Sequence, residues 1–328
     1  MVEISRRRML GAAAATGLAA TAARAVPPAL PDLKGQAVLI TGCSSGFGRL
    51  TAEHLARAGA KVFATMRNLP RPEAAEVRQL ARDAKLDLTV LELDVTDEAS
   101  VAAAIAAAEK AVGRGLDVLV NNAGIGITGP VEVQDTAATS LAFDTNVLGY
   151  HRVARAALPG MRARKTGHIF AVSSQLGRVI APFAGHYSAT KFAVEAMFEQ
   201  LAYEVRAHGI GVTIIQPGGY PTDIWVNRNR LSGELKARAE ARHAAGYPEV
   251  VARMGAEDGS GRSADPMDIP RAIAAVLAAP APARPLRVPV SAGPIPQTGI
   301  NQASAEAQIL MLGRSPTFGP IVRAVHGR

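Results

Sequence analysis

A serine, a tyrosine and a lysine are spaced in this sequence so that they could move a proton together. Ser174 follows a β-branched run, Tyr187 comes thirteen residues later, and Lys191 lies four residues beyond the tyrosine. Residues four apart share one face of a helix. A phenol has an ordinary pKa of about 10, and a neighbouring ammonium favours its ionised form. The spacing therefore predicts that Tyr187 is an acid–base group, that Lys191 lowers its pKa, and that Ser174 holds a substrate oxygen.

A glycine-rich turn, TGCSSGFG, occupies residues 41–48 near the start of the sequence. It follows the apolar run 37–41 and precedes a helical pattern over 49–58. Glycines between a strand and a helix let the backbone approach a diphosphate, whose charge is stabilised by the free amides of the helix. The turn is therefore predicted to bind a dinucleotide.

The same residues also contain the pattern GxSxG, which is typical of the nucleophile elbow of a hydrolase. In that alternative Ser44 would be the nucleophile, and a late histidine would complete the triad. His243 and His326 are the candidates for that histidine. The alternative leaves the overlapping pattern of Thr41-Gly42 and Gly46-x-Gly48 unexplained.

The end of the second predicted strand indicates which dinucleotide is bound. An NAD-binding unit places an acidic residue there to hold the ribose hydroxyls, whereas this sequence has Met66 and Arg67. A guanidinium can pair with the additional 2′-phosphate of NADP. NADP(H) is therefore the expected cofactor, with NAD(H) as the less favoured alternative.

Strands and helices must alternate to position these residues. Short β-branched runs, separated by longer helical ones, predict strands at 37–41, 61–65, 88–93, 118–121, 168–172 and 212–215, with a proline-containing edge strand at 286–290. This alternation predicts an α/β fold, a single Rossmann-type doubly wound parallel sheet with helices on both faces. Ligands are then expected at the carboxyl ends of the strands.

Composition excludes several classes of protein. The chain has 328 residues, of which 48% are hydrophobic and 20% charged, so it can bury a sizeable core. Its single cysteine, Cys43, excludes an internal disulfide, and the seven histidines lack metal-ligand spacing, so no metal site is expected. The net charge of +8 is spread along the chain with few aromatics, so no nucleic-acid partner is expected.

The two ends of the chain differ from its middle. Residues 1–25 combine an arginine cluster, a mild apolar stretch and a small-residue ending, which resembles a twin-arginine export signal and predicts a periplasmic or exported protein without a stable membrane span once the signal is removed. The alternative is a cytoplasmic enzyme with a basic tail. Residues 26–31 predict a linker, 32–290 the main domain, and 220–265 a lid on the substrate side. Residues 291–328 form a C-terminal extension with no clear pattern.

Taken together, these motifs resemble the short-chain dehydrogenase/reductase family of the TGxxxGxG type, over roughly residues 32–290. The family's order of motifs continues with NNAG at 121–124, Asn146, and Pro-Gly at 217–218. The catalytic set is Asn146, Ser174, Tyr187 and Lys191. The cofactor-binding set is Thr41, Gly42, Ser44, Ser45, Gly46, Phe47, Gly48, Arg67, Asp94, Val95, Asn122, Ala123, Gly124, Tyr187, Lys191, Pro217, Gly218 and Thr222.

The resemblance implies an NADP(H)-dependent oxidoreductase that interconverts a ketone or aldehyde with an alcohol. Asn146 would support a proton-relay water, Asp94 would contact the adenine, and Lys191 would also anchor the ribose. Segments 64–68 and 217–219 resemble the hydroxysteroid and retinol dehydrogenase branch, which favours a lipophilic substrate. Helices near 146–164 and 187–207 would pair copies into a homodimer or homotetramer.

Two features set this sequence apart from the family's usual pattern. Ser45 stands where a basic residue is commoner, so the prediction of NADP(H) depends on Arg67, and an export signal is unusual in a mostly cytoplasmic family. His186, next to the catalytic tyrosine, is interpreted as a wall of the pocket. The alternative from another functional class is a Rossmann-type protein that binds a nucleotide without turnover, and the intact Ser-Tyr-Lys set argues against it.

Overall fold

A parallel sheet of seven strands forms the centre of the molecule, in the order β3-β2-β1-β4-β5-β6-β7. The computed structural model describes residues 30–257, 259 and 261–327. The strands are β1 (Ala37–Ile40), β2 (Lys61–Met66), β3 (Leu88–Glu92), β4 (Val118–Asn121), β5 (Gly167–Val172), β6 (Ile210–Pro217) and β7 (Arg287–Val290). The doubly wound parallel sheet is confirmed, and β7 is the predicted edge strand. The predicted signal at 1–25 and most of the linker lie outside the described residues.

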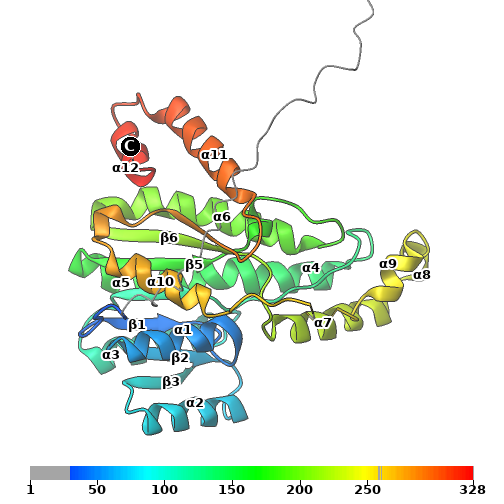
Figure 1. Ribbon diagram of the computed structural model, residues 1–328, viewed down its shortest axis with the longest axis horizontal. Coiled ribbons are helices and arrows are strands. Elements are labelled where there is room, and N and C mark those ends of the chain that lie inside the picture. The colour runs from blue at the N-terminus through cyan, green and yellow to red at the C-terminus, as the bar shows by residue number, and fades with distance from the viewer. Residues whose placement is uncertain (1–29, 258, 260, 328) are drawn as a thin grey trace, which may run out of the picture.

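Helices cover both faces of this sheet (Figure 1). One layer contains α1 (Gly46–Arg57), α2 (Pro72–Asp83) and α10 (Asp268–Ala278), and the other contains α3 (Glu98–Val112), α5 (Gly149–Arg164) and α6 (His186–Val205). Side chains alternate along each strand, so Val38 and Ile40 pack under the first layer while Ala37 and Leu39 pack under the second. Burial on both faces explains why the strands are continuous apolar runs.

The segment between β6 and α10 forms a separate helical arm. It comprises α7 (Ile224–Arg238), α8 (Ala241–Ala244) and α9 (Pro248–Arg253), and it projects from the end of the sheet at which the strands stop (Figure 1). A small cluster of buried residues joins the arm to the segment after β4 and to α4 (Thr136–Phe143). The predicted lid region is therefore more helical than its polar sequence indicated. The arm begins after β6 and ends before α10, where the chain returns to the helices that cover the sheet.

The C-terminal extension, which had no clear pattern, forms α11 (Gln297–Leu312) and α12 (Gly319–Val325). Both lie on the side of α6 in Figure 1. A charged network beneath them is almost fully buried: Arg287 of β7 contacts Glu195 at 2.7 Å and Glu199 at 2.6 Å. Tyr203 donates to Glu199 at 2.6 Å and also bonds His326 at 2.8 Å. This network connects the end of the chain to α6.

Short irregular turns complete the chain. They are one turn of π-helix, η1 (Asp144–Leu148), between α4 and α5, and the 3₁₀ turns η2 (Gln175–Gly177), η3 (Arg206–His208) and η4 (Ala281–Ala283). Within the described part of the chain, none of the helices has both the length and the apolar character needed to cross a bilayer.

Candidate active site

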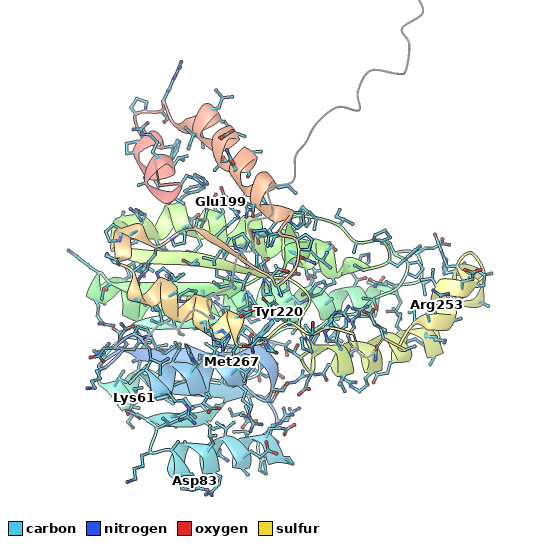
Figure 2. All side chains as sticks on the ribbon, in the orientation of Figure 1. Lys61, Asp83, Glu199, Tyr220, Arg253 and Met267 are labelled. Atoms are coloured by element: carbon cyan, nitrogen blue, oxygen red, sulfur yellow. The ribbon has the colours of Figure 1, made fainter. Side chains whose placement is uncertain are left out.

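A cavity of about 690 Å³ opens at the carboxyl ends of the strands, where the sheet order reverses between β1 and β4. Figure 2 places Tyr220 beside this region, near the middle of the molecule, and Arg253 out on the arm. The cavity wall includes these predicted site residues: Gly42, Ser44, Ser45, Gly46, Phe47, Arg67, Asp94, Val95, Asn122, Ala123, Gly124, Ser174, Tyr187, Lys191, Pro217, Gly218 and Thr222. Thr41, Gly48 and Asn146 lie behind it.

The glycine turn leaves no room for side chains at two positions. Gly42 has a φ of +72°, and a Cβ there would lie 2.8 Å from the Cα of Ala123. A Cβ on Gly48 would lie 2.2 Å from the carbonyl oxygen of Gly42 and 2.5 Å from Nδ2 of Asn122. Glycine at these positions therefore allows the turn, α1 and the segment after β4 to approach one another closely.

Hydrogen bonds join this turn to the segment after β4. The buried hydroxyl of Thr41 accepts from the backbone amides of Asn122 at 2.9 Å and Ala123 at 3.0 Å. The side chain of Asn122 donates in return to the carbonyl oxygens of Thr41 and Gly42, at 2.9 and 3.1 Å. Thr41 and Asn122 thus fix the floor of the cavity, and Thr41 does so without being exposed in it.

The first turn of α1 keeps its amide groups available to a ligand. Its N-cap residue, Ser45, is extended and makes no capping hydrogen bond with its side chain. By contrast, Asp97 caps α3 by accepting from the amides of Ala99 and Ser100. Amides left free at a helix N-terminus attract an anion such as a diphosphate. The turn therefore fits the dinucleotide predicted for it.

Two arginines line the cavity beyond the end of β2. Arg67 was predicted there, and the structure adds Arg71, the residue that precedes α2. Arg71 pairs with Glu73 at 2.8 Å, and the contact raises the pKa of Arg71. An i+4 spacing from Arg67 is the signal that would have found Arg71. Asp94, on the same side, accepts from the amide and hydroxyl of Thr96 at 2.9 and 2.7 Å.

Tyr187 lies in the first turn of α6, and Ser174 follows β5, so strand and helix bring the two hydroxyls together. Burial raises the pKa of Tyr187, while a hydrogen bond from Ser174 and the positive charge of Arg228 act to lower it. The direction is opposite to the one predicted from the lysine. Burial removes water from the phenolate, and this cost exceeds the gain from the neighbouring groups. Tyr187 is therefore protonated at neutral pH.

Lys191 lies on the same face of α6, and its Nζ is 5.8 Å from the centre of the Tyr187 ring. The ammonium donates to the carbonyl oxygen of Val172 at 2.9 Å. Burial lowers the pKa of Lys191 to about 8, and the negative charge of Glu195 acts in the opposite direction. The ammonium of Lys191 therefore lies close to the Tyr187 ring. Above pH 8, only part of the protein keeps this lysine protonated.

Asn146 occupies η1 and is fully buried behind Gly124. Its Oδ1 accepts from the amide of Ile125 at 2.8 Å, and its Nδ2 donates to the carbonyl oxygen of Ile125 at 2.8 Å and to Thr190 at 3.1 Å. A Cβ on Gly124 would lie 3.2 Å from Oδ1 of Asn146 and 3.8 Å from Nζ of Lys191. Asn146 thus joins the floor of the cavity to α6 and the lysine.

Three histidines considered from the sequence do not contribute to the cavity. His186 bonds Thr139 through its ring at 2.6 Å and does not line the wall, so its interpretation as a pocket wall was wrong. His243 pairs with Glu132 on the arm, and His326 bonds Tyr203. Neither of these last two reaches the cavity that contains Ser44. The structure therefore does not assemble the hydrolase triad.

The arm supplies a second wall that sequence reasoning left without named residues. Trp225 and Arg228 of α7 line the cavity together with Met254 and Arg262. Arg228 donates to the hydroxyl of Thr128 at 3.2 Å, and its guanidinium lies 4.6 Å from the centre of the Trp225 ring. A basic residue in a polar helix resembles any surface residue in sequence, so no motif pointed to it. The side of the cavity at the glycine turn and the side at the arm thus come from different architectures.

Comparison with known proteins identifies what the chain is similar to. Residues 36–232 match the family model described as short chain dehydrogenase. The chain is 38% identical over 211 residues to a 3-ketodihydrosphingosine reductase of Bacteroides thetaiotaomicron, which covers 64% of this chain and 74% of that protein. It is 41% identical over 189 residues to human retinol dehydrogenase 8, covering 57% of this chain and 59% of the relative.

A solved structure agrees with the match. The short chain dehydrogenase/reductase of Burkholderia phymatum, in complex with NAD, superposes with a TM-score of 0.68 at 25% identity, covering 87% of this chain and 98% of that one. The alignment extends well beyond the segment matched by the family model. The 87% of the chain that aligns is a longer stretch than residues 36–232.

Proposed function

Because the chain belongs to the short-chain dehydrogenase family, and is an oxidoreductase that interconverts alcohols and carbonyl compounds with a nicotinamide cofactor, we propose that it uses NADP(H) and that Tyr187 is its acid–base group. One observation carries the proposal. Tyr187, Ser174 and Lys191 line the same cavity as the glycine turn and Arg67.

The residues of the cavity fit a dinucleotide. Uncapped amides at the start of α1 suit a diphosphate, and the absence of a Cβ at Gly42 and Gly48 keeps the turn closely packed against the segment after β4. Asp94 and Val95 would border the adenine, and Pro217, Gly218 and Thr222 would border the nicotinamide. When bound, the nicotinamide supplies or accepts a hydride.

The preference for NADP(H) follows from charge. Arg67 and Arg71 both line the cavity where the 2′ position of the adenosine ribose would lie, at the end of β2. Glu73 is held by Arg71 and has a pKa lowered to about 2, so it stays charged and neutralises part of that arginine. Among the described residues, Arg67 has no carboxylate partner, so its guanidinium is left for a 2′-phosphate, whose recognition by guanidinium groups is strong and geometrically specific. We therefore expect Arg67 to dominate the discrimination.

The proton moves through Tyr187. Because burial raises its pKa, the phenol is protonated at neutral pH and can donate to the oxygen of a carbonyl group as that oxygen gains charge. Ser174 hydrogen-bonds the phenol and can share the same substrate oxygen. Lys191 supplies positive charge behind the ring, which favours the phenolate left after donation. In the direction of alcohol oxidation, the phenolate accepts the proton.

Self-association is a further part of the proposal. Leu148 of η1 and Phe192 of α6 are 48% and 39% exposed, and both lie on the segments predicted to pair copies of the chain. Both side chains would be buried if a second copy of the chain packed against these segments. We propose a homodimer or homotetramer, which light scattering on the purified protein would measure. A monomer at micromolar concentration would contradict it.

We also propose that residues 1–25 direct export of the protein. N-terminal sequencing of the protein from a native host would test this proposal.

A coenzyme-linked absorbance assay tests the enzymatic proposal. The purified protein would be screened against ketones, aldehydes and alcohols with NADPH, NADH and their oxidised forms. We expect kcat/KM to be higher with NADPH than with NADH, and Arg67→Ala to reduce that ratio about 10- to 100-fold while leaving the values with NADH nearly unchanged. Arg57→Ala is the matched control, because Arg57 pairs with Glu53 near the other end of α1 and does not line the cavity. A preference for NADH in the unmodified protein would refute the assignment.

A further inference from the structure

Basic residues of the segment 220–265 line the cavity more often than its acidic residues do. Residues 220–265 contain seven basic and seven acidic side chains. Among the described residues of this segment, however, those that line the cavity are four arginines and a single glutamate. They are Arg228, Arg230, Arg253, Arg262 and Glu257. The fold therefore converts a segment of balanced charge into a positively charged wall.

Arg228 lies at the substrate end of this wall. Its Nε donates to Thr128 at 3.2 Å, and its Cδ is 3.4 Å from the position a Cβ on Gly126 would take. Both contacts are with the segment that follows β4. Its positive charge also acts on the hydroxyl of Tyr187. Arg228 and Tyr187 thus line the same cavity.

The charge of Arg228 is only partly neutralised within the wall. Its guanidinium pairs with Glu257, and the same carboxylate also pairs with Arg262 at 2.8 Å. Both guanidiniums pack on Trp225, Arg228 at 4.6 Å and Arg262 at 3.7 Å from the ring centre. Among the described residues, two cations therefore share one anion, which leaves a surplus positive charge on this part of the wall. A partly buried cation without a full partner is costly, and an anionic ligand removes that cost.

Contacts around Trp225 fix the surface on which the guanidiniums of Arg228 and Arg262 pack. Trp225 donates its ring N–H to the carbonyl oxygen of Tyr220 at 2.7 Å, which fixes the surface on which both arginines pack. A Cβ at Gly259 would lie 2.6 Å from that ring, so the chain closes tightly over its other side. A fixed guanidinium suits recognition of planar or tetrahedral oxyanions.

We propose that Arg228 binds an anionic group, a carboxylate or a phosphate ester, on the same molecule whose carbonyl or alcohol reacts at Tyr187. The inference rests on the proposed function and names its substrate class. Apolar residues such as Leu176, Phe183 and Met254 also line the cavity and would contact the carbon skeleton. The substrate is therefore an amphipathic acid, in contrast to the neutral alcohol in the name of the retinol relative.

Pairs of probes that differ only in charge test the proposal. The unmodified enzyme would be assayed in the reductive direction with 4-oxopentanoate against methyl 4-oxopentanoate, with 4-acetylbenzoate against its methyl ester, and with dihydroxyacetone phosphate against dihydroxyacetone. The third pair distinguishes phosphate from carboxylate recognition. We expect kcat/KM to favour the anionic member of at least one pair by about 10-fold or more, since hydrogen bonds to charged groups are stronger than neutral ones.

The variant Arg228→Gln should reduce that ratio of anionic to neutral probe about 10- to 100-fold, mainly through KM, and Arg228→Lys should restore part of it. Arg238→Gln is the matched control, because it removes a positive charge from the same helix at a surface pair with Asp135, outside the cavity. Coenzyme titration and thermal melting of each variant report whether it is folded.

The outcomes separate the two proposals. Faster turnover of the neutral member in all three pairs, or an unchanged ratio in Arg228→Gln, would overturn the inference and leave the dehydrogenase activity standing. Turnover of none of the six probes, and of no compound in the wider screen, would overturn the proposed function and this inference with it. Loss of the ratio in Arg238→Gln as well would attribute the preference to general surface charge, which also contradicts the role of Arg228.

Discussion

The two walls of the cavity are held by different kinds of contact. On the cofactor side, Gly42 and Gly48 bring backbone against backbone, and the buried Thr41 fastens the turn to the next strand. On the arm, long side chains add to a small buried apolar cluster, with contacts such as Arg238 to Asp135 at 2.6 Å and Lys236 to the carbonyl oxygen of Ala252 at 2.7 Å. A wall of close backbone contacts tolerates few residues and therefore produces a motif. A wall of long side chains can change its specificity by single substitutions.

Replacing the phenol at the junction of the two walls should have the largest effect. Tyr187→Phe removes the hydroxyl but keeps the ring, so we expect kcat to fall about 100- to 10,000-fold while the coenzyme dissociation constant changes little. Stopped-flow turnover and fluorescence titration with the coenzyme would measure the two quantities. Retained turnover would show that the proton comes from another group and would break the assignment of the junction.

The pH dependence of stability should distinguish the buried Lys191 of the cofactor wall from Lys236, the lysine of the arm. Lys191 has a pKa of about 8 when folded and about 10.4 when unfolded. Below pH 8 both states hold the proton, and the burial cost acts in full. Between about pH 8 and 10.4 only the unfolded chain holds it, so stability rises with pH.

Relative to Lys191→Met, the unmodified protein should therefore gain about 3 kcal/mol of unfolding free energy across that range. Urea unfolding of both proteins at several pH values gives the difference, in which the titration of other groups cancels. Lys236→Met, at an exposed position on the arm, is the control. A difference independent of pH would mean that Lys191 titrates normally in the folded protein.

A methyl group added to the glycine turn should weaken coenzyme binding by more than the loss of fold stability accounts for. In Gly48→Ala the new Cβ meets the carbonyl oxygen of Gly42 and the side chain of Asn122. The turn must move to relieve the overlap, at a cost of about 1–3 kcal/mol. We expect weaker coenzyme binding by calorimetry and a lower Tm. Gly233→Ala on the arm, where a Cβ meets nothing within 4 Å, is the control.

The smallest effect is expected for an ion pair on the arm. Arg238→Gln breaks an exposed contact with Asp135, and such pairs contribute about 1 kcal/mol or less. Its unfolding free energy should therefore stay close to that of the unmodified protein, and high salt should reduce what difference there is. A loss of several kcal/mol would contradict the view that the arm is held by many weak contacts.

The sheet and the cofactor wall could be predicted because their physics repeats along the chain. Buried parallel strands are apolar runs such as 37–40, and Gly42 and Gly48 are required by close approach, so both leave local signals. Arg228 has no local signal, since only the tertiary position of α7 turns it inward. The raised pKa of Tyr187 also lay beyond the sequence, because it depends on how completely water is excluded.

The C-terminal helices are a second part of the fold that could not be predicted from the sequence. In α11 only the first residue, Gln297, is buried, so the pattern of apolar positions that predicts a packed helix is missing. The polar contacts that attach this region come from residues distant in sequence, such as Gln216 and Asn301 at 2.8 Å. Sequence spacing alone does not show pairs of this kind.

The buried carboxylate of Glu199 ties the last helix to the helix that carries the phenol. His326 and Arg287 both reach that carboxylate, from positions more than eighty residues away along the chain. Anyone shortening the protein ahead of α12 to aid crystallisation would therefore strip a neighbour from an enclosed negative charge. We expect the shortened enzyme to be less stable, although the deleted residues do not line the cavity.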